Sequence, residues 1–426
     1  MTMSILPSRS SLIPLFILGS LLMASACSTP KAPDTDTNAK ADTDAKADAA
    51  QADKPPEQAT EPVDINNPES CRACHAPIVE EWEQSMHSRA HYDKDPIFAN
   101  MRDLRVKRQG EIIVPKCRNC HNPRDTKDES TPAAKAGVSC AACHNAAHVE
   151  QSDMAKGAKL ISYDESGVLL GARNIAPDAS PAHPTGPAAP HLSDGSSICL
   201  ACHSNTANPA GVPACTTGSE ISSGSHAEAS CASCHMPKVK GSSGPYSDRA
   251  EHASHTFPGP HRAYYQADTS LLEQAVDLSL SWQGDELIAT ATNKSGHSFP
   301  SGFPGRMAMV KVRGFDAAGA EVWTNIKDNP PAEDPSAVFF KIYIDEEGKP
   351  TMPPFAKELK SDTRLSPDEI RTLRWTPPQS VKRAEAIVVY RLMPPKVAKA
   401  LGLTEAPEAQ AIAFSKKKAT REEPSK

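Results

Sequence analysis

Hydrophobic and polar positions divide the 426-residue chain into parts of different texture. A short apolar run covers residues 12–23, and residues 28–68 contain almost nothing that could be buried. Long periodic segments are few between residues 71 and 262, whereas apolar and polar residues alternate after about residue 270. Alternation with a period of two is typical of strands that bury one face. The pattern therefore predicts a mostly irregular or α-helical part followed by an antiparallel β part.

The β part is predicted to cover residues 270–418 and to fold as an antiparallel β-sandwich. The alternating stretches that support this prediction are residues 275–293, 307–325, 337–350 and 383–394. Turn signals interrupt them at Gly284, Gly319 and Gly348. Short helices are expected at Ser366–Arg371 and Pro395–Leu401, and the sequence from Lys416 onward is expected to fray, with residues 419–426 as the tail.

The first 26 residues have the layout of a secretory signal peptide, with a basic start, the apolar run and small residues at 24–26. Cys27 follows at once and resembles the lipidated cysteine of bacterial lipoproteins, and Ser28 after it favours the outer membrane. Ordinary signal-peptidase cleavage is the alternative, because Ala-Ser-Ala also suits that enzyme. Residues 27–68, rich in Ala, Asp, Lys and Pro, predict a disordered tether. We therefore expect an exported outer-membrane lipoprotein that faces the periplasm or the exterior.

Composition limits how the central part can be stabilised. Hydrophobic residues make up 38% of the chain and aromatic residues 5%, both low for this length, and prolines number 39. Something other than a large aliphatic core must therefore organise residues 71–262. The net charge of -6 includes no basic excess, which argues against nucleic-acid binding.

The sequence Cys-x-x-Cys-His occurs five times in this central part. Two thiols three residues apart on a helical turn can each bind one vinyl group of the same porphyrin, and the next imidazole then binds its iron. The pattern indicates five covalently bound haem c groups in a pentahaem domain at residues 69–265, with the macrocycles as its core. The attachment cysteines are Cys71, Cys74, Cys117, Cys120, Cys140, Cys143, Cys199, Cys202, Cys231 and Cys234, and the proximal iron ligands are His75, His121, His144, His203 and His235.

Two other uses of cysteine pairs are alternatives to haem. Structural zinc needs two such pairs, or added histidines, for each metal ion, and does not require a histidine directly after every pair. A disulfide within Cys-x-x-Cys is usually redox-active, and the repeated histidine would be unexplained. Cys215 lies outside the motifs and is expected to be an unreactive thiol, with haem contact or intermolecular bridging as the alternative.

A six-coordinate iron needs a second axial ligand, and ten of the fifteen histidines lie outside the motifs. His87 is expected on the helix after the first motif, with His91 one turn along as its competitor. His148 lies four residues after His144, so on a helix it would serve a neighbouring haem. The segment 252–261 offers His252, His255 and His261, and weaker candidates are His191, His226 and His297.

The five motifs, with "EEWEQSMHSRA", "GVSCAACHNAAH", "HTFPGPH" and "GHSFPSGFPGR", resemble the multihaem c-type cytochromes related to the tetrahaem electron acceptors of hydroxylamine oxidation. The resemblance covers roughly residues 69–306 and implies closely packed haem pairs, bis-histidine ligation and a C-terminal sandwich. It implies distal ligands at His87, His148, His255 and His261, to which we add His191. The chain departs from the family at residues 145–147, where Asn-Ala-Ala replaces a frequent Gly-Pro-Gly.

The sequence as a whole predicts an exported electron carrier that relays single electrons in respiratory or extracellular electron transfer. Its expected partners are other cytochromes, a quinol-linked donor or an extracellular acceptor, together with the membrane that Cys27 would enter. The alternative is a multihaem reductase of nitrite, hydroxylamine or a similar substrate, which needs one haem with an open sixth position. No catalytic residue is assigned, because no catalytic constellation stands out in residues 270–418.

Overall fold

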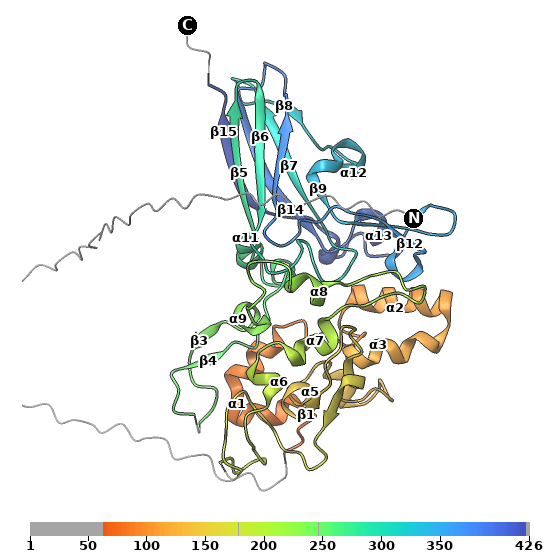
Figure 1. Cartoon of the computed structure of the whole chain (residues 1–426), viewed down its shortest axis with the longest axis vertical. Coiled ribbons are helices and arrows are strands. Elements are labelled where there is room, and N and C mark those ends of the chain that lie inside the picture. Colours follow the sequence, from red (N-terminus) through yellow and green to blue (C-terminus); the bar gives the residue numbers. More distant parts are fainter. Residues whose placement is uncertain (1–62, 178, 246, 423–426) are drawn as a thin grey trace, which may run out of the picture. The chain divides into compact units, whose positions relative to one another are not determined.

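The computed structural model describes residues 63–422 apart from residues 178 and 246 (Figure 1). The predicted signal peptide, Cys27, the predicted tether up to residue 62 and residues 423–426 lie outside the described residues. Among those that are described, no helix combines the length and the apolar character needed to cross a membrane.

Short helices joined by long irregular segments make up the part of the chain before residue 276, as the weak periodicity predicted. The α-helices here are α1 (Pro68–Glu83), α2 (Pro96–Gln109), α3 (Val114–His121), α4 (Pro132–Lys135), α5 (Cys140–His144), α6 (Pro190–Ser193), α7 (Ser197–His203), α8 (Thr217–Ile221), α9 (Cys231–His235), α10 (Arg262–Tyr265) and α11 (Ser270–Ala275). Two small antiparallel hairpins accompany them, β1 (Ala146–Val149) with β2 (Ile161–Tyr163) and β3 (Lys238–Lys240) with β4 (Glu251–Ala253). Short 3₁₀ helices lie at Glu111–Ile113 and Gly157–Leu160.

The two longest helices begin at signals that can be read directly in the sequence. Pro68 and Pro96 occupy the first helical turn of α1 and α2, where a missing backbone N–H costs nothing. The preceding side chains cap these helices, because Asn67 accepts from the N–H of Glu69 and Asp95 accepts from two amides of α2. Local chemistry therefore fixes where these helices start.

Antiparallel sheets dominate the chain after residue 275, and this β-rich character confirms the prediction. One sheet has the order β13-β6-β5, a second the order β15-β14-β7-β8 with β9 paired to β7, and a third the order β11-β10-β12. Their strands are β5 (Val276–Gln283), β6 (Glu286–Asn293), β7 (Met307–Phe315), β8 (Glu321–Thr324), β9 (Val338–Phe339), β10 (Lys341–Ile344), β11 (Pro350–Thr351), β12 (Glu358–Asp362), β13 (Ile370–Trp375), β14 (Arg383–Arg391) and β15 (Ile412–Thr420). Helices α12 (Pro330–Glu333) and α13 (Pro395–Ala400) and three 3₁₀ turns, at Pro335–Ala337, Pro353–Phe355 and Pro407–Ala409, connect them. Their arrangement as a sandwich stays a prediction.

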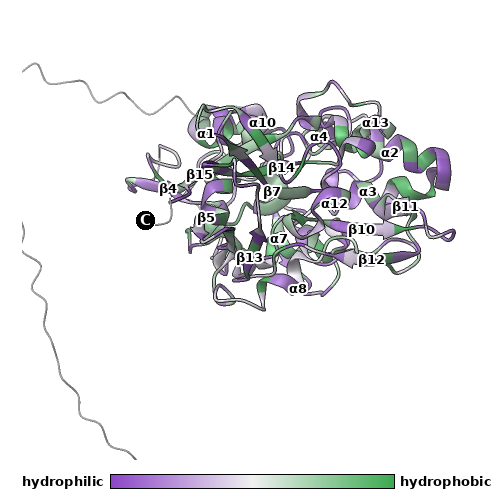
Figure 2. Cartoon of the chain, turned by 90° about the horizontal axis from the view of Figure 1, so that it is seen from above, coloured by the Kyte–Doolittle hydropathy of each residue, from purple (hydrophilic) through white to green (hydrophobic). Residues whose placement is uncertain are grey.

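Most buried apolar side chains belong to one cluster, built mainly from β-strands. Its largest fully buried members include Tyr390, Phe339 and Leu278, and α2 adds Ile97 and Met101. Figure 2 shows both hydrophobic and hydrophilic residues along helix α2. Among the described residues, a second cluster, in the motif-bearing part (residues 68–275), has four buried members, which are Ala146, Val149, Leu160 and Ala201. The motif-bearing part therefore has little aliphatic core of its own, as composition predicted.

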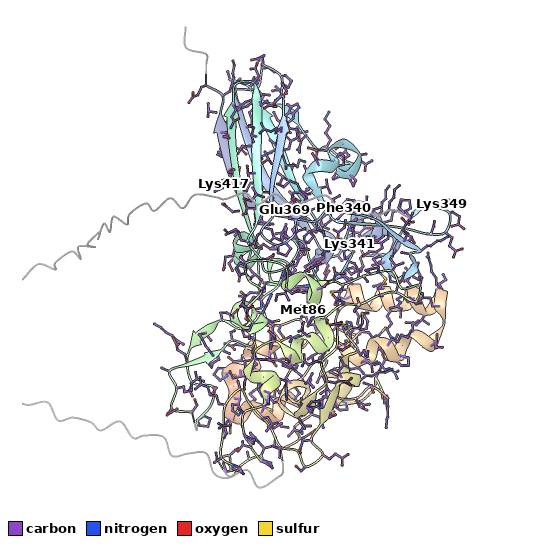
Figure 3. The ribbon with its side chains drawn as sticks, in the orientation of Figure 1. Met86, Phe340, Lys341, Lys349, Glu369 and Lys417 are labelled. Carbon is purple, nitrogen blue, oxygen red and sulfur yellow. The ribbon has the colours of Figure 1, made fainter. Side chains whose placement is uncertain are left out.

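The helix predicted at Ser366–Arg371 is wrong, whereas the one predicted near Pro395 is confirmed as α13. Glu369, labelled in Figure 3, accepts a hydrogen bond from the N–H of Ser366 at 2.8 Å and closes a turn. Asp368 has a positive φ of 59°, and Ile370 already pairs with Thr292 of β6. An acidic residue three positions after a serine often starts a helix, but here sheet pairing prevails.

Two further expectations about helices are wrong, and both concern candidate ligands. Helix α1 ends at Glu83, so His87 lies in the turns that follow it rather than on the helix. The Ser85 hydroxyl donates to the Trp82 carbonyl, a bond that competes with helix continuation. Helix α5 ends at His144, and His148 lies on strand β1 with an exposed side chain.

The last strand forms where no alternating stretch was predicted. Strand β15 runs to Thr420, so the lysines expected to fray, including Lys417 in Figure 3, belong to a strand at the edge of its sheet. Lysines on an edge strand discourage pairing with other chains. Arg421 beyond it is buried and donates to the carbonyls of Pro378 and Val381.

Glu385 on β14 makes the free energy of unfolding depend on pH in the acidic range. Burial alone would raise the pKa of Glu385, but hydrogen bonds from Lys416 and Arg383 outweigh it and lower the pKa to about 2. Since its ordinary pKa is 4.5, the unfolded chain binds a proton here at pH values where the folded chain does not. The resulting stabilisation is complete above pH 4.5 and disappears as the pH falls through about 2.

We therefore expect the wild-type protein to lose more unfolding free energy than a Glu385→Gln variant when the pH is lowered from about 6 to about 3. Chemical denaturation of both proteins at the two pH values measures this difference. Equal losses in the two proteins would contradict the assigned role of Glu385.

Candidate functional site

Each of the five motifs, numbered 1 to 5 in chain order, places its histidine where a helix ends or breaks. Helices α3, α5, α7 and α9 terminate at the motif histidines, which are His121, His144, His203 and His235. His75 lies inside α1 but has non-helical dihedral angles, and Pro77 follows it. The two cysteines of each motif thus lie on helical turns, as the spacing predicted.

Backbone carbonyls orient four of the five motif histidines. The ring Nδ1 atoms of His75, His121, His144 and His235 lie 2.6–2.7 Å from the carbonyl oxygens of Ser243, Ala90, Leu170 and Pro258, respectively. An imidazole that donates its Nδ1–H to a carbonyl keeps its free electron pair on Nε2. This is the usual arrangement of a metal-binding histidine. These four residues are therefore prepared to bind a metal through Nε2.

Two glycines allow other segments to approach the motifs closely. An added Cβ at Gly244 would lie 2.9 Å from the ring of His75. An added Cβ at Gly157, which has a φ of +59°, would lie 2.1 Å from the Asn119 carbonyl oxygen and 2.8 Å from the Cys120 sulfur. Real side chains do not fit at such distances, so both positions require glycine.

Contacts between the motifs do not simply follow their order in the chain. The thiols of Cys71 in motif 1 and Cys140 in motif 3 are neighbours, and their proximity raises the pKa of Cys71 and lowers that of Cys140. The same mutual pKa shift, caused by proximity, relates Cys202 of motif 4 to Cys120 of motif 2, and Cys199 of motif 4 to Cys231 of motif 5. Motif 4 therefore contacts two others, and the eleven described cysteines are all free thiols.

Three histidines from outside the motifs face motif histidines. The ring centroids of His87 and His203 are 6.2 Å apart, those of His255 and His144 are 6.2 Å apart, and those of His297 and His235 are 6.5 Å apart. With metal–nitrogen bonds of about 2 Å, two imidazoles on opposite sides of one metal ion have centroids roughly 6 Å apart. The three distances match that arrangement.

Burial keeps these imidazoles neutral, which is the form that binds a metal. It lowers the pKa of His87 to about 3 and that of His255 to about 4. It also lowers the pKa values of His144, His203 and His297. All five side chains are therefore uncharged at neutral pH.

The remaining candidates differ in how their ring nitrogens are used. Both nitrogens of His252 are occupied, by the Gly241 carbonyl at 2.8 Å and by Glu81 at 3.0 Å. In the described part of the chain, His91 and His191 have buried Nε2 atoms without a hydrogen-bond partner. His261 is largely buried, and burial lowers its pKa to about 3. His148 is exposed, and His226 lies beside the Ser225 hydroxyl.

The structure therefore brings together two of the five predicted distal ligands, His87 and His255, with motif histidines. It also places His297 in such a pair, although the sequence ranked it among the weaker candidates. The signal that could have raised its rank was its position in "GHSFPSG", a phrase that carries part of the family resemblance. Spacing could not reveal it, because His297 is 62 residues from His235.

The residues present fit haem c better than zinc. Paired thiols on helical turns suit covalent attachment of the porphyrin, and the Nδ1-anchored and facing imidazoles suit its iron. Within the residues that the structure describes, no three His, Cys, Asp or Glu side chains converge on one point where they could hold a metal ion together. A structural zinc site needs four such ligands, so that alternative is disfavoured.

Comparison with known proteins agrees with this chemistry. Residues 70–145 match the model of a family described as "Cytochrome c554 and c-prime". The structure resembles the crystal structure of a penta-heme cytochrome c552 from Thermochromatium tepidum with a TM-score of 0.72 and 26% sequence identity, over 85% of this chain and 100% of that chain. No curated protein matches the chain. Together with the motifs, these matches support a multihaem c-type cytochrome with haem c as cofactor and a role in electron transfer.

Proposed function

We propose that the chain is an exported pentahaem c-type cytochrome that relays single electrons between redox partners. When bound, haem iron supplies one-electron chemistry by alternating between two oxidation states. The three facing histidine pairs carry the proposal, because each pair would supply an iron with two imidazole ligands and leave no place for a substrate at motifs 3, 4 and 5. The protein's contribution is to hold, space and orient the cofactors.

The proposed attachment residues are the ten motif cysteines, and the proximal ligands are the five motif histidines. We assign His255, His87 and His297 as the second ligands at motifs 3, 4 and 5, respectively. The candidates for the sixth ligands at motifs 1 and 2 are His91 and His191, whose buried Nε2 atoms have no hydrogen-bond partner among the described residues, and the predicted His148 and His261.

Location and partners complete the proposal. A signal-peptide layout, Cys27 beside a cleavage site and a polar tether support an exported protein anchored to the outer membrane through a lipid. Other cytochromes, a quinol-linked donor or an extracellular acceptor are the proposed partners. A relation to the electron acceptors of hydroxylamine oxidation is supported by the sequence resemblance stated above.

Low-temperature EPR of the oxidised protein, combined with peptide mass mapping, tests the function. We expect a porphyrin adduct on all five Cys-x-x-Cys-His peptides and low-spin iron throughout. A motif without its adduct would contradict the pentahaem proposal. One haem with a high-spin signal that shifts on addition of nitrite or hydroxylamine would overturn the relay in favour of a reductase, because an open sixth site would then bind substrate.

A further inference from the structure

We propose that Glu220 is a positioning residue for His297, through which helix α8 fixes the second iron ligand at motif 5. This inference rests on the proposed function, because it assumes that a haem c binds at that motif. The β-rich part (residues 276–420) thereby contributes a residue to the proposed cofactor site, since His297 lies between β6 and β7 and faces His235.

The segment that carries His297 is fixed on one side by the β-rich part itself. The Asn293 side chain at the end of β6 donates to the His297 carbonyl at 2.8 Å and also to the Leu365 carbonyl. Phe299, two residues after His297, exchanges two backbone hydrogen bonds with Leu365, of 2.8 and 3.0 Å. These bonds connect the segment to the strands but do not involve the motif-bearing part.

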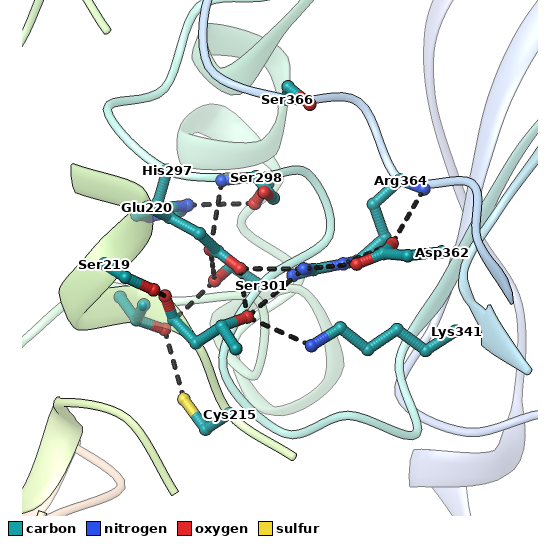
Figure 4. Close-up of polar contacts among 12 residues, drawn as sticks. Cys215, Ser219, Glu220, His297, Ser298, Ser301, Lys341, Asp362, Arg364 and Ser366 are labelled. Carbon is teal, nitrogen blue, oxygen red and sulfur yellow. Dashed lines mark hydrogen bonds and ion pairs between the residues drawn. The ribbon is translucent and has the colours of Figure 1, made fainter. Parts of the chain in front are cut away.

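Glu220 holds the same segment from the other side (Figure 4). Its Oε2 accepts from the backbone N–H of Ser298 at 3.1 Å and from the Ser301 hydroxyl at 2.8 Å. Ser298 directly follows His297, so this carboxylate fixes the backbone next to the ligand. Helix α8 begins fourteen residues after His203, so Glu220 ties the ligand segment to the part of the chain that carries the motifs.

The other carboxylate oxygen of Glu220, Oε1, also has two partners. Oε1 accepts from the Thr216 hydroxyl and pairs with Arg364 at 2.8 Å, and Arg364 also pairs with Asp362 at 2.8 Å. The Lys341 ammonium donates to the same Thr216 hydroxyl at 3.0 Å. Two carboxylates and two cations thus balance in a cluster where Glu220 is 9% exposed and Lys341 is 7% exposed.

A carboxylate is the group that this geometry requires. Glu220 accepts three hydrogen bonds and forms one ion pair with its two oxygens, which an ionised carboxylate can do and an amide cannot. Burial would raise the pKa of Glu220, but Arg364 and the hydroxyl donors outweigh it and leave the pKa below its ordinary value. The group is therefore ionised at neutral pH, and its loss would leave the Ser298 amide without its acceptor.

The test compares Glu220→Ala and Glu220→Gln with a control, Glu385→Ala. Glu385 is a similarly buried carboxylate, 7% exposed, that pairs with Arg383 and Lys416 rather than with the His297 segment. Three readouts are measured on the full-length protein, which are the number of porphyrin adducts by mass, the high-spin fraction by EPR, and hydrogen exchange of the peptide that contains Ser298.

In Glu220→Ala we expect an unchanged number of adducts, a high-spin signal from about one fifth of the iron, and faster exchange at Ser298. Glu220→Gln keeps part of the hydrogen bonding and should give a smaller high-spin fraction. Glu385→Ala should lose stability without any high-spin signal, which separates positioning from a general structural effect.

Low-spin iron throughout and unchanged exchange in Glu220→Ala would overturn the proposal. If that variant does not fold, Glu220→Gln is judged by the same two readouts and the same outcomes. Absence of the porphyrin adduct at Cys231 and Cys234 in the wild-type protein would instead refute the proposed function at motif 5, and this result is read from mass alone. The two failures are therefore distinguishable.

Discussion

Alanine at His255 is expected to convert one haem from low-spin to high-spin, whereas alanine at His252, three residues earlier, is not. His255 faces His144 with a centroid distance of 6.2 Å, and its Nδ1 is anchored by the Ala253 carbonyl at 2.9 Å. His252 uses both ring nitrogens elsewhere. Truncation at His255 therefore removes an iron ligand, and truncation at His252 removes two hydrogen bonds.

EPR integration of high-spin against low-spin iron measures the effect, and His255→Ala should show a high-spin signal from about one fifth of the iron. Alanine at His87 or at His297 should have the same result at motif 4 or motif 5. His252→Ala is the matched control, because it removes an equally large side chain from the same segment. A high-spin signal in the control, or its absence in His255→Ala, would contradict the assignment.

Alanine at Gly157 is expected to disrupt motif 2 far more than alanine at Gly167 disrupts its surroundings. Both glycines have a positive φ, +59° and +80°, so either substitution strains the backbone by about 1–2 kcal/mol. Only at Gly157 would the new Cβ meet other atoms, the Asn119 carbonyl oxygen and the Cys120 sulfur, whereas nothing lies within 4 Å at Gly167. Overpacking of this kind costs about 1–3 kcal/mol more.

The expected result is a lower denaturation midpoint and a reduced yield of porphyrin adduct on the peptide that contains Cys117 and Cys120. Chemical denaturation and peptide mass mapping of both variants measure the two effects. Because both variants share the backbone strain, the difference between them isolates the contact with motif 2. Equal behaviour of the two variants would show that the 157 segment can move away from the motif at little cost.

The strands show which elements of this chain the local pattern of apolar and polar residues predicts. The alternating stretches became β5 to β10 and β14, and the turn signals at Gly284, Gly319 and Gly348 lie between the paired strands β5 and β6, β7 and β8, and β10 and β11. Strands β12, β13 and β15 were not predicted, since charged residues interrupt their alternation. They form because a neighbouring strand offers unpaired backbone groups, and a single segment's sequence does not contain that information.

The sequence by itself determined the chemistry of the attachment sites. A motif of five consecutive residues holds two thiols and an imidazole, so the spacing that haem c requires is complete within one helical turn. The scarcity of aliphatic residues likewise indicated that the central part has little core of its own, and the structure agrees.

Only the tertiary structure decided which histidines face the motifs. His87 and His203 are 116 residues apart, and the pairs His144 with His255 and His235 with His297 are 111 and 62 residues apart. No spacing rule connects such positions, because their approach depends on how turns, strands and buried ion pairs pack. The same packing places hydrogen-bond partners at both ring nitrogens of His252 and brings Glu220 to the segment of His297. Neither residue stands out in the sequence.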